Sequence, residues 1–309
     1  MNLRLSIAPH IRSGETTSRL MLNVIIALVP CAIAGIYNFG VNALVVLAVS
    51  MVTAVAAEYL FQVIARRPVR VGDLSALVTG LILGLNLPPT APWWMAMVGS
   101  AFAIIIVKEL FGGIGSNFMN PALTARAVLL ASWPVFMTNF VNPTYWAEGV
   151  DAVTTATPLA TGSVATLDLL LGRIPGSIGE VSKIMILVGL AYLLITRTIS
   201  WRIPVIMVAT TGLLSWAFGS DPLAAVLSGG LLFGAVFMAT DYTTSPMTAK
   251  GQALYAVGCG LIVAVIRAFG NYPEGVTYGI LVMNVATPLI DKFIKNRVYG
   301  HRKEERANA

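Results

Sequence analysis

Three threonines behind an aspartate are the most distinctive chemical groups of this sequence. Residues 151–160 read DAVTTATPLA, which places the hydroxyls of Thr154, Thr155 and Thr157 shortly after Asp151. A threonine hydroxyl can carry an ester-linked group, but it is a poor nucleophile until a base or a metal ion activates it. No histidine lies near this stretch. Activation would therefore have to come from another protein, and the alternative is a Thr-rich turn without chemistry.

A second set of candidates surrounds a proline-led apolar stretch. Arg126 follows Pro121 by about one and a half helical turns, and it could bind a phosphate or a ring carbonyl of a ligand, pair with Glu109 or cap a helix end. Asn120 and Asn117 lie in the preceding turn, where asparagine commonly satisfies backbone groups. We place Asn120 and Arg126 among the candidate cofactor contacts.

Four carboxylates lie near the ends of apolar stretches: Glu58, Asp73, Glu180 and Asp241. Such groups could line an ion path. Positions near helix ends also suit helix capping and the extension of charged groups toward water.

Several classes of chemistry are excluded. The sequence has no P-loop, Rossmann fingerprint or cluster with metal-ligand spacing. Its two cysteines, Cys31 and Cys259, are too few for an iron–sulfur cluster, which normally needs four thiolates. The net charge of +6 would suggest nucleic acid in a soluble protein, but the charge has a simpler explanation in a membrane protein, and we expect no nucleic-acid partner.

The elements that position these residues are predicted to be membrane helices. Of the 309 residues 57% are apolar and 11% charged, and the mean hydropathy is +0.80. The apolar stretches are long enough to cross about 30 Å of hydrocarbon as helices and do not alternate as barrel strands do. The polar N-terminus shows no cleavable signal peptide. We predict about ten spans, at 20–39, 42–64, 74–88, 92–111, 121–138, 183–196, 203–219, 222–239, 252–269 and 274–291.

Charge sets the predicted orientation. With the N-terminus in the cytoplasm, sixteen of the twenty Lys and Arg residues fall in inside segments, Lys108 among them, and outside segments hold only Arg173 and Lys183. The positive-inside rule therefore puts both termini in the cytoplasm and 139–182 outside it.

The chain also repeats itself. LVTGLILG at 77–84 resembles LSGGLLFG at 227–234. An odd number of spans per half gives inverted topology, and short Gly/Pro-interrupted segments at matching positions indicate half-helices near the midplane. We predict repeats over 1–138 and 183–309, separated by the outside segment 139–182. Gly80 and Gly230 are expected to be tightly packed.

The stretch around the threonines resembles the flavinylation signal of the NqrB/RnfD family. In that pattern an Asp is followed three residues later by Ser or Thr, and the motif closes on Ala-Thr. Asp151, Thr154, Ala156 and the acceptor Thr157 match it, whereas Thr155 stands where Gly is frequent. The resemblance implies FMN joined to Thr157 by a phosphoester, attached outside the cytoplasm by a Mg-dependent flavin transferase.

Three further stretches resemble the same family in the same order: GGIGSNFMNPALTARA at 112–127, LGRIPGSIGEVS at 171–182 and ATDYTTSPMTAKG at 239–251. The chain length is more similar to that of RnfD members than to that of the longer NqrB members. The resemblance implies an all-α bundle of two inverted five-helix repeats in the bacterial inner membrane.

The resemblance further implies that the chain is one subunit of an Rnf-type complex. Such a complex passes electrons between ferredoxin and NAD and moves Na⁺ or H⁺. The A, B, C, E and G subunits would be its partners, and a non-covalent riboflavin could accompany the FMN. A channel or permease for a small polar solute is the alternative from another class, and it would give a colourless protein. The B subunit of a Na⁺-translocating quinone reductase is a third possibility, which ferredoxin-like neighbours would exclude.

Overall fold

The computed structural model describes residues 16–143, 166–270 and 275–295. These residues form helices and connecting turns, and no β-strand occurs among them. The all-α prediction is therefore confirmed for the described part of the chain.

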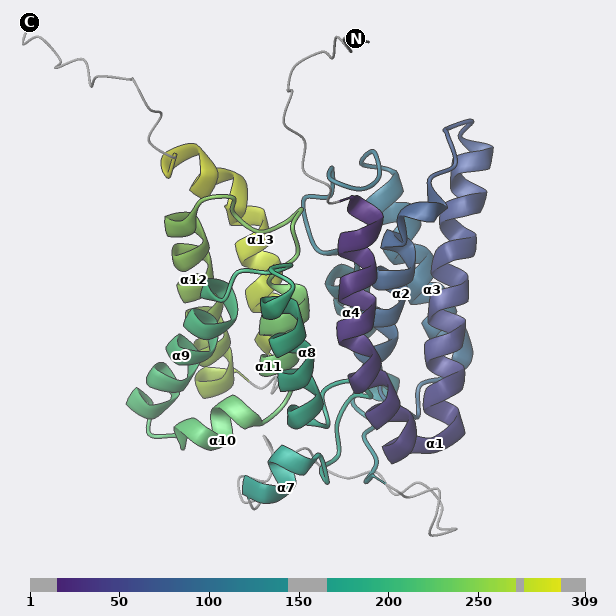
Figure 1. Cartoon of the computed structure of the whole chain (residues 1–309). Helices are drawn as coiled ribbons and strands as arrows, with labels where there is room; N and C mark the ends of the chain where they lie inside the picture. The colour runs from purple at the N-terminus through teal and green to yellow at the C-terminus, as the bar shows by residue number, and fades with distance from the viewer. Residues whose placement is uncertain (1–15, 144–165, 271–274, 296–309) are drawn as a thin grey trace, which may run out of the picture.

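The first helix is a bent element that covers two predicted spans. Helix α1 extends over Thr17–Ile64 and breaks at Gly40, whose φ of 69° lies in the left-handed region. Glycine adopts this conformation without the steric penalty of a Cβ atom. The break divides α1 into arms at 17–39 and 41–64, which run in opposite directions in Figure 1.

The remaining elements follow as shorter helices, two of which are π-helices. They are η1 (Val71–Asp73), α2 (Ser75–Leu85), α3 (Trp93–Phe102), the π-helix η2 (Ala103–Glu109), α4 (Pro121–Ser132), α5 (Pro134–Met137), α7 (Thr166–Leu171), α8 (Lys183–Ile195), α9 (Arg202–Ala217), α10 (Pro222–Leu227), α11 (Leu231–Phe233), the π-helix η3 (Gly234–Met238), α12 (Ala249–Phe269) and α13 (Gly275–Phe293). Helical residues occupy each range in which the sequence predicts a span.

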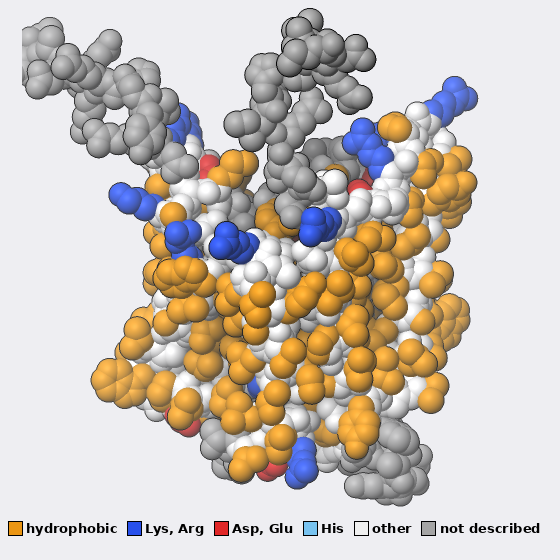
Figure 2. Space-filling model, viewed as in Figure 1, with side chains coloured by type: hydrophobic (Ala, Val, Ile, Leu, Met, Phe, Trp, Pro, Cys, Tyr) orange, Lys and Arg blue, Asp and Glu red, His pale blue; other side chains and the backbone are white. Residues whose placement is uncertain are grey.

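By length and composition, two described helices could cross a membrane: α1 and α12. Helices α2, α4, α8 and α9 are apolar but only 10–17 residues long. The surface is nevertheless apolar over the middle of the molecule (Figure 2). On α1, for example, Ile33 is 62% and Val52 is 67% exposed, and apolar surface this extensive is unusual on a soluble monomer.

The helices pack as two groups. Helix α1 contacts α2, α3 and α8, whereas α12 packs between α9 and α13. In Figure 1 α1, α2 and α3 lie on the right, α9 and α12 lie on the left, and α8 lies between them. Helix α1 begins and α13 ends on the same side of the molecule, and α7 and α10 lie at the opposite side.

Close packing at Gly80 joins α2 to α1. A Cβ atom at Gly80 would lie 2.8 Å from the backbone oxygen of Ser50 and 2.9 Å from Cβ of Ala54. Ser50 Oγ donates a hydrogen bond of 2.6 Å to the Gly80 carbonyl oxygen. At Gly230, the residue before α11, a Cβ atom would meet only the end of the Glu180 side chain, with Oε2 at 2.7 Å, and no backbone atom within 4 Å. Tight packing against backbone is therefore confirmed at Gly80 but not at Gly230.

Two cations stabilise the break between α10 and α11. Lys183, counted from the sequence as an outside residue, is fully buried and donates to the carbonyl oxygens of Glu180 and Gly229. Arg267 of α12 donates to the carbonyl oxygen of Ala225 at 2.6 Å. Cations suit the carbonyl end of a helix, so both residues support the end of α10.

Candidate functional site

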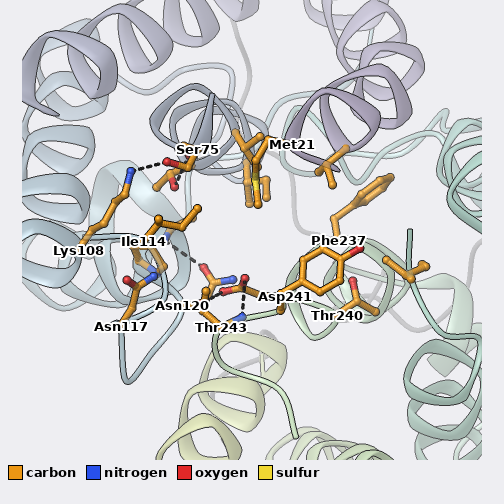
Figure 3. A pocket seen from close by; sticks show the side chains of 18 of the residues that line it. Met21, Ser75, Lys108, Ile114, Asn117, Asn120, Phe237, Thr240, Asp241 and Thr243 are labelled. Atoms are coloured by element: carbon orange, nitrogen blue, oxygen red, sulfur yellow. Dashed lines mark hydrogen bonds between the residues drawn. The ribbon is translucent and has the colours of Figure 1, made fainter. Parts of the chain in front are cut away.

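A central cavity lies between the two groups of helices. Its volume is about 80 Å³. The lining comes from α1, α2, η2, α4, α8, η3 and three connecting segments. It comprises Met21, Val24, Ser75, Val78, Thr79, Ile82, Lys108, Ile114, Asn117, Asn120, Pro121, Ala122, Leu193, Ile199, Val236, Phe237, Thr240, Asp241, Tyr242 and Thr243. The chain thus brings together residues more than 200 positions apart. Figure 3 shows polar side chains on one part of this lining and apolar side chains on another.

Both π-helices contribute to the cavity. The wider turns are formed by hydrogen bonds from Leu110 N to Ile105 O at 3.1 Å in η2 and from Ala239 N to Gly234 O at 2.8 Å in η3. Lys108 of η2 and Phe237 of η3 line the cavity. Short π-helical turns are rare and occur frequently at functional sites, so their presence on both sides of this cavity makes it the leading candidate.

A buried ion pair forms one wall. Lys108 is 2% and Glu58 is 1% exposed, and Lys108 Nζ lies 2.6 Å from Glu58 Oε1. The same ammonium group donates to Ser75 Oγ at 2.6 Å (Figure 3), and Ser75 Oγ donates onward to Asp73 Oδ1. The charge count placed Lys108 in a cytoplasmic segment, and the structure shows that its side chain is buried beside Glu58.

Behind the ion pair lies a second, outer cavity of about 190 Å³. It is lined by Glu58, Gln62, Arg67, Pro68, Arg70, Asp73, Glu109, Gly112, Gly113 and Ile114. Gln62 Nε2 donates to Glu58 Oε1 at 3.3 Å and to Glu109 Oε1 at 3.2 Å, and therefore connects these two carboxylates.

The two asparagines of the Gly-rich turn play different roles. Asn120 Oδ1 accepts from the backbone N–H groups of Ala122 at 3.1 Å and Leu123 at 3.2 Å, which caps α4. Its Nδ2 donates to Met238 O at 3.4 Å and so links α4 to η3. Asn117 is 9% exposed, and its Oδ1 has no hydrogen-bond partner within the described part of the chain.

The Arg126 side chain contacts the end of α2. It is 4% exposed in α4, and Nη1 donates to Asn86 Oδ1 at 3.1 Å. Asn86 caps the end of α2 and donates from Nδ2 to Ile82 O at 2.7 Å. Arg126 is not among the residues that line the central cavity. The structure therefore places Asn120, but not Arg126, at this cavity.

Asp241 is held in a turn at the edge of the cavity. Its carboxylate accepts from Thr243 N at 3.3 Å, Thr243 Oγ1 at 3.0 Å and Thr244 Oγ1 at 3.2 Å. Desolvation raises the pKa of this carboxyl, and the hydrogen bonds from Thr243 and Thr244 oppose the rise. These hydrogen bonds show that the Asp241 side chain stabilises the turn.

The predicted flavin attachment site is outside the described residues, because Asp151, Thr154, Ala156 and Thr157 fall in the segment 144–165. The described chain on either side of this segment lines a groove of about 970 Å³ beside the end of the first arm of α1, close to the break at Gly40. Asn142 and Pro143 come before the segment, and Leu171 and Arg173 come after it.

The sequence placed Asn117 and Asn120 in one turn, but Lys108 was not predicted to belong to a site. A lysine within an apolar stretch is itself a signal, because such a charge is costly unless it is paired. Glu58 was among the candidate carboxylates, but its pairing with Lys108 had no sequence signal, since the two residues are 50 positions apart.

Comparisons with known proteins give a consistent result. The sequence matches the model of the NQR2, RnfD, RnfE family over residues 4–300. It is 52% identical to the D subunit of the Na(+)-translocating ferredoxin:NAD(+) oxidoreductase complex of Acetobacterium woodii, over 98% of this chain and 97% of the relative. The D subunit of the proton-translocating ferredoxin:NAD(+) oxidoreductase complex of Clostridium ljungdahlii is 44% identical, over 97% of this chain and 96% of that protein. The D subunit of the ion-translocating oxidoreductase complex of Halorhodospira halophila is 38% identical, over 96% and 95%.

Proposed function

Because the chain belongs to the NQR2, RnfD, RnfE family, we propose that it acts as the D subunit of an Rnf-type complex in the bacterial inner membrane. Such a complex transfers electrons between ferredoxin and NAD and couples the transfer to ion movement. The observation that carries this proposal is near full-length similarity to relatives that are named as D subunits. Two of these relatives are named for different ions, so the coupled ion is Na⁺ or H⁺.

The chain would carry electrons through flavins. The first is FMN, joined through a phosphoester to Oγ1 of Thr157 by a separate flavin transferase that recognises Asp151, Thr154 and Ala156. The groove that begins at Asn142 and includes Arg173 offers space and a cation beside this segment. A flavin supplies one- and two-electron transfer, while the protein fixes its position and electronic environment.

The second flavin is a non-covalent riboflavin in the central cavity. The lining offers apolar side chains such as Val236 and Phe237 and, on another part, polar groups, but the volume of about 80 Å³ is below that of a typical ligand site, so binding of the ring requires the cavity to widen. The unsatisfied acceptor of Asn117 would receive an N–H or O–H donor of the ligand. The ammonium group of Lys108 would face a carbonyl or a ring nitrogen.

In this proposal the chain spans the membrane about ten times as two inverted repeats, and the partner A, B, C, E and G subunits hold the remaining cofactors. The apolar exposed surface supports immersion in lipid. The short helices α2 and α10, each next to a turn, suit half-helices that end within the membrane.

The intact mass of the purified chain and peptide mapping test the covalent flavin. Expression beside a flavin transferase should add one FMN, and the adduct should map to Thr157. Thr157→Ala should abolish the adduct, because the acceptor hydroxyl is lost, and should stop ferredoxin–NAD turnover by the complex.

Thr155→Ala is the matched control, since it removes a neighbouring hydroxyl from the same stretch and should leave the adduct in place. An adduct on Thr154 or Thr155, or full turnover by Thr157→Ala, would refute the assignment.

A further inference from the structure

The glycine-rich turn between η2 and α4 lies between two cavities. Ile114 of this turn belongs to both linings, that of the central cavity of about 80 Å³ and that of the outer cavity of about 190 Å³. Gly112 and Gly113 line only the outer cavity, and Asn117 lines only the central one. Figure 3 shows Ile114 on the same part of the central lining as Lys108 and Asn117. The turn is therefore part of the wall between the two cavities.

The backbone conformation of this turn depends on glycine. Gly112, Gly113 and Gly115 have φ values of 119°, 89° and 89°, in a region that other residues adopt only at a steric cost. The backbone N–H groups of Ile114 and Gly115 form no hydrogen bond within the described part of the chain. A Cβ atom at Gly115 would meet nothing within 4 Å, so packing does not hold the tip of the turn. Few hydrogen bonds and few contacts are the features of a segment that opens locally.

Both ends of the turn are fixed. At its start, the N–H groups of Gly112 and Gly113 donate to the last two carbonyl groups of η2 at 3.1 Å and 3.0 Å. At its end, Asn120 caps α4 and donates to the last carbonyl group of η3. The rings of Phe111 and Phe118, on either side of the glycines, lie 4.8 Å apart between centroids. A movement of the turn is therefore limited to the residues between these points.

Ile114 closes a polar space with an apolar side chain. Charged and polar residues make up most of the outer lining, namely Glu58, Gln62, Arg67, Arg70, Asp73 and Glu109. Of these, Arg67 and Arg70 are exposed, so the outer cavity reaches the surface of the molecule. Neither cavity reaches the volume of about 300 Å³ at which small-molecule sites begin, whereas the two together approach it.

The ion pair of Lys108 and Glu58 is the other structure at this boundary, and it is less suited to move. Lys108 lines the central cavity and Glu58 the outer one, and both side chains are buried. Lys108 Nζ is bonded to Glu58 Oε1 and to Ser75 Oγ, both at 2.6 Å. Separating two buried charges is strongly unfavourable. The turn can move at Ile114 without breaking either of these bonds.

We propose that residues 113–116 form a lid between the two cavities and that the Ile114 side chain closes the passage. The structure shows the closed form, in which the cavities are separate. When the lid moves, they join into one chamber, and a small polar molecule can pass from the surface near Arg70 to the ammonium group of Lys108. This inference does not rest on the proposed function, because it requires no bound group in either cavity.

The reactivity of a cysteine inside the central cavity tests the passage. Val78 lines this cavity but not the outer one and is 8% exposed. The reagent is 2-aminoethyl methanethiosulfonate, a small water-soluble cation, added to the purified full-length chain that carries Val78→Cys. In this background Ile114→Ala removes most of the closing side chain. It should raise the reaction rate about tenfold, which corresponds to about 1.4 kcal/mol of lost stability of the closed form.

Ile199→Ala is the matched control, because Ile199 is also a partly buried isoleucine in a connecting segment and lines the central cavity but not the outer one. It should leave the rate unchanged. Equal melting temperatures of Ile114→Ala and Ile199→Ala would show that the comparison is between equally folded chains. Equal acceleration by Ile199→Ala, or no reaction of Val78→Cys in the Ile114→Ala chain, would overturn the passage at Ile114.

A second measurement follows the lid itself in a chain without these variants. Spin labels at Ser116→Cys and Met247→Cys report the distance from the lid to the turn before α12, where Met247 is 88% exposed and its N–H donates to Asp291. Labels at Leu110→Cys and Met247→Cys form the control pair, because Leu110 is 57% exposed and its N–H is bonded to Ile105 of η2. Double electron–electron resonance should show two distance populations for the first pair and one for the second. A single population for both pairs would mean that residues 113–116 do not move, and the lid would be wrong.

Discussion

Two asparagines three positions apart differ in how completely their side-chain amides are hydrogen-bonded. The amide of Asn120 is used on both sides, because Oδ1 caps α4 and Nδ2 contacts Met238 O. Asn117 Oδ1 is buried without a donor in the described part of the chain. An unsatisfied buried acceptor costs about 1–3 kcal/mol, so a ligand that donates to Asn117 would recover this free energy.

Replacing Asn117 should therefore weaken riboflavin binding with little change in the fold. We expect Asn117→Ala to raise the dissociation constant about tenfold, since one hydrogen bond contributes about 1.4 kcal/mol. Riboflavin per chain after dialysis gives the measurement. Asn38→Ala is the control, because Asn38 lines the groove at the other end of the molecule. Equal retention by both variants would show that Asn117 does not contact the ligand.

At the scale of elements, the sequence was most informative about where helices begin and end. Gly40 lies between two predicted spans, and the structure breaks α1 at this residue. Asn120 and Pro121 were expected at a turn, and they form the start of α4. These boundaries could be predicted because glycine, asparagine and proline act through their own backbone preferences.

Other elements carried no comparable signal. Arg66 and Arg197 each adopt a φ of 53° just beyond α1 and α8, at positions where glycine is usual. The π-helices η2 and η3 were predicted as ordinary spans. The contact between Asn120 and Met238 joins residues 118 positions apart. Such features depend on how distant helices pack, and one sequence does not contain that information in its local pattern.

Gly80 gives an element-scale prediction with a clear sign. In a helix interior, Gly→Ala normally stabilises by about 1 kcal/mol. At Gly80 the new Cβ would lie 2.8 Å from the backbone oxygen of Ser50, so α2 would have to move away from α1. We expect Gly80→Ala to destabilise the chain by about 1–3 kcal/mol, measured as a lower melting temperature in detergent.

Gly72→Ala provides the comparison, because a Cβ atom at Gly72 would meet nothing within 4 Å. It should leave the melting temperature unchanged. If Gly80→Ala were as stable as Gly72→Ala, the close approach of α1 and α2 would not contribute to the stability of the fold.

At the scale of the whole molecule, the two ends differ in how many Lys and Arg side chains they carry. Lys and Arg side chains gather at the end where α1 begins and α13 ends, and few appear at the end where α7 and α10 lie (Figures 1 and 2). Lys108 and Lys183 are both buried. Leaving them out of the charge count removes one residue from the cytoplasmic segments and one from the outside segments. The asymmetry therefore remains, and it favours the basic end as cytoplasmic.

Cysteine labelling tests this orientation with residues on opposite ends. Gly72 belongs to the basic end, because its carbonyl oxygen accepts a hydrogen bond from Ser18 near the start of α1. Ser220 is exposed between α9 and α10, at the other end. The native Cys31 and Cys259 are buried and should contribute little background. In intact cells, a membrane-impermeant maleimide should label Ser220→Cys at once and Gly72→Cys only after the membrane is permeabilised. The reverse order would place the basic end outside, and Thr157 would then face the cytoplasm, away from the transferase that the flavin attachment requires.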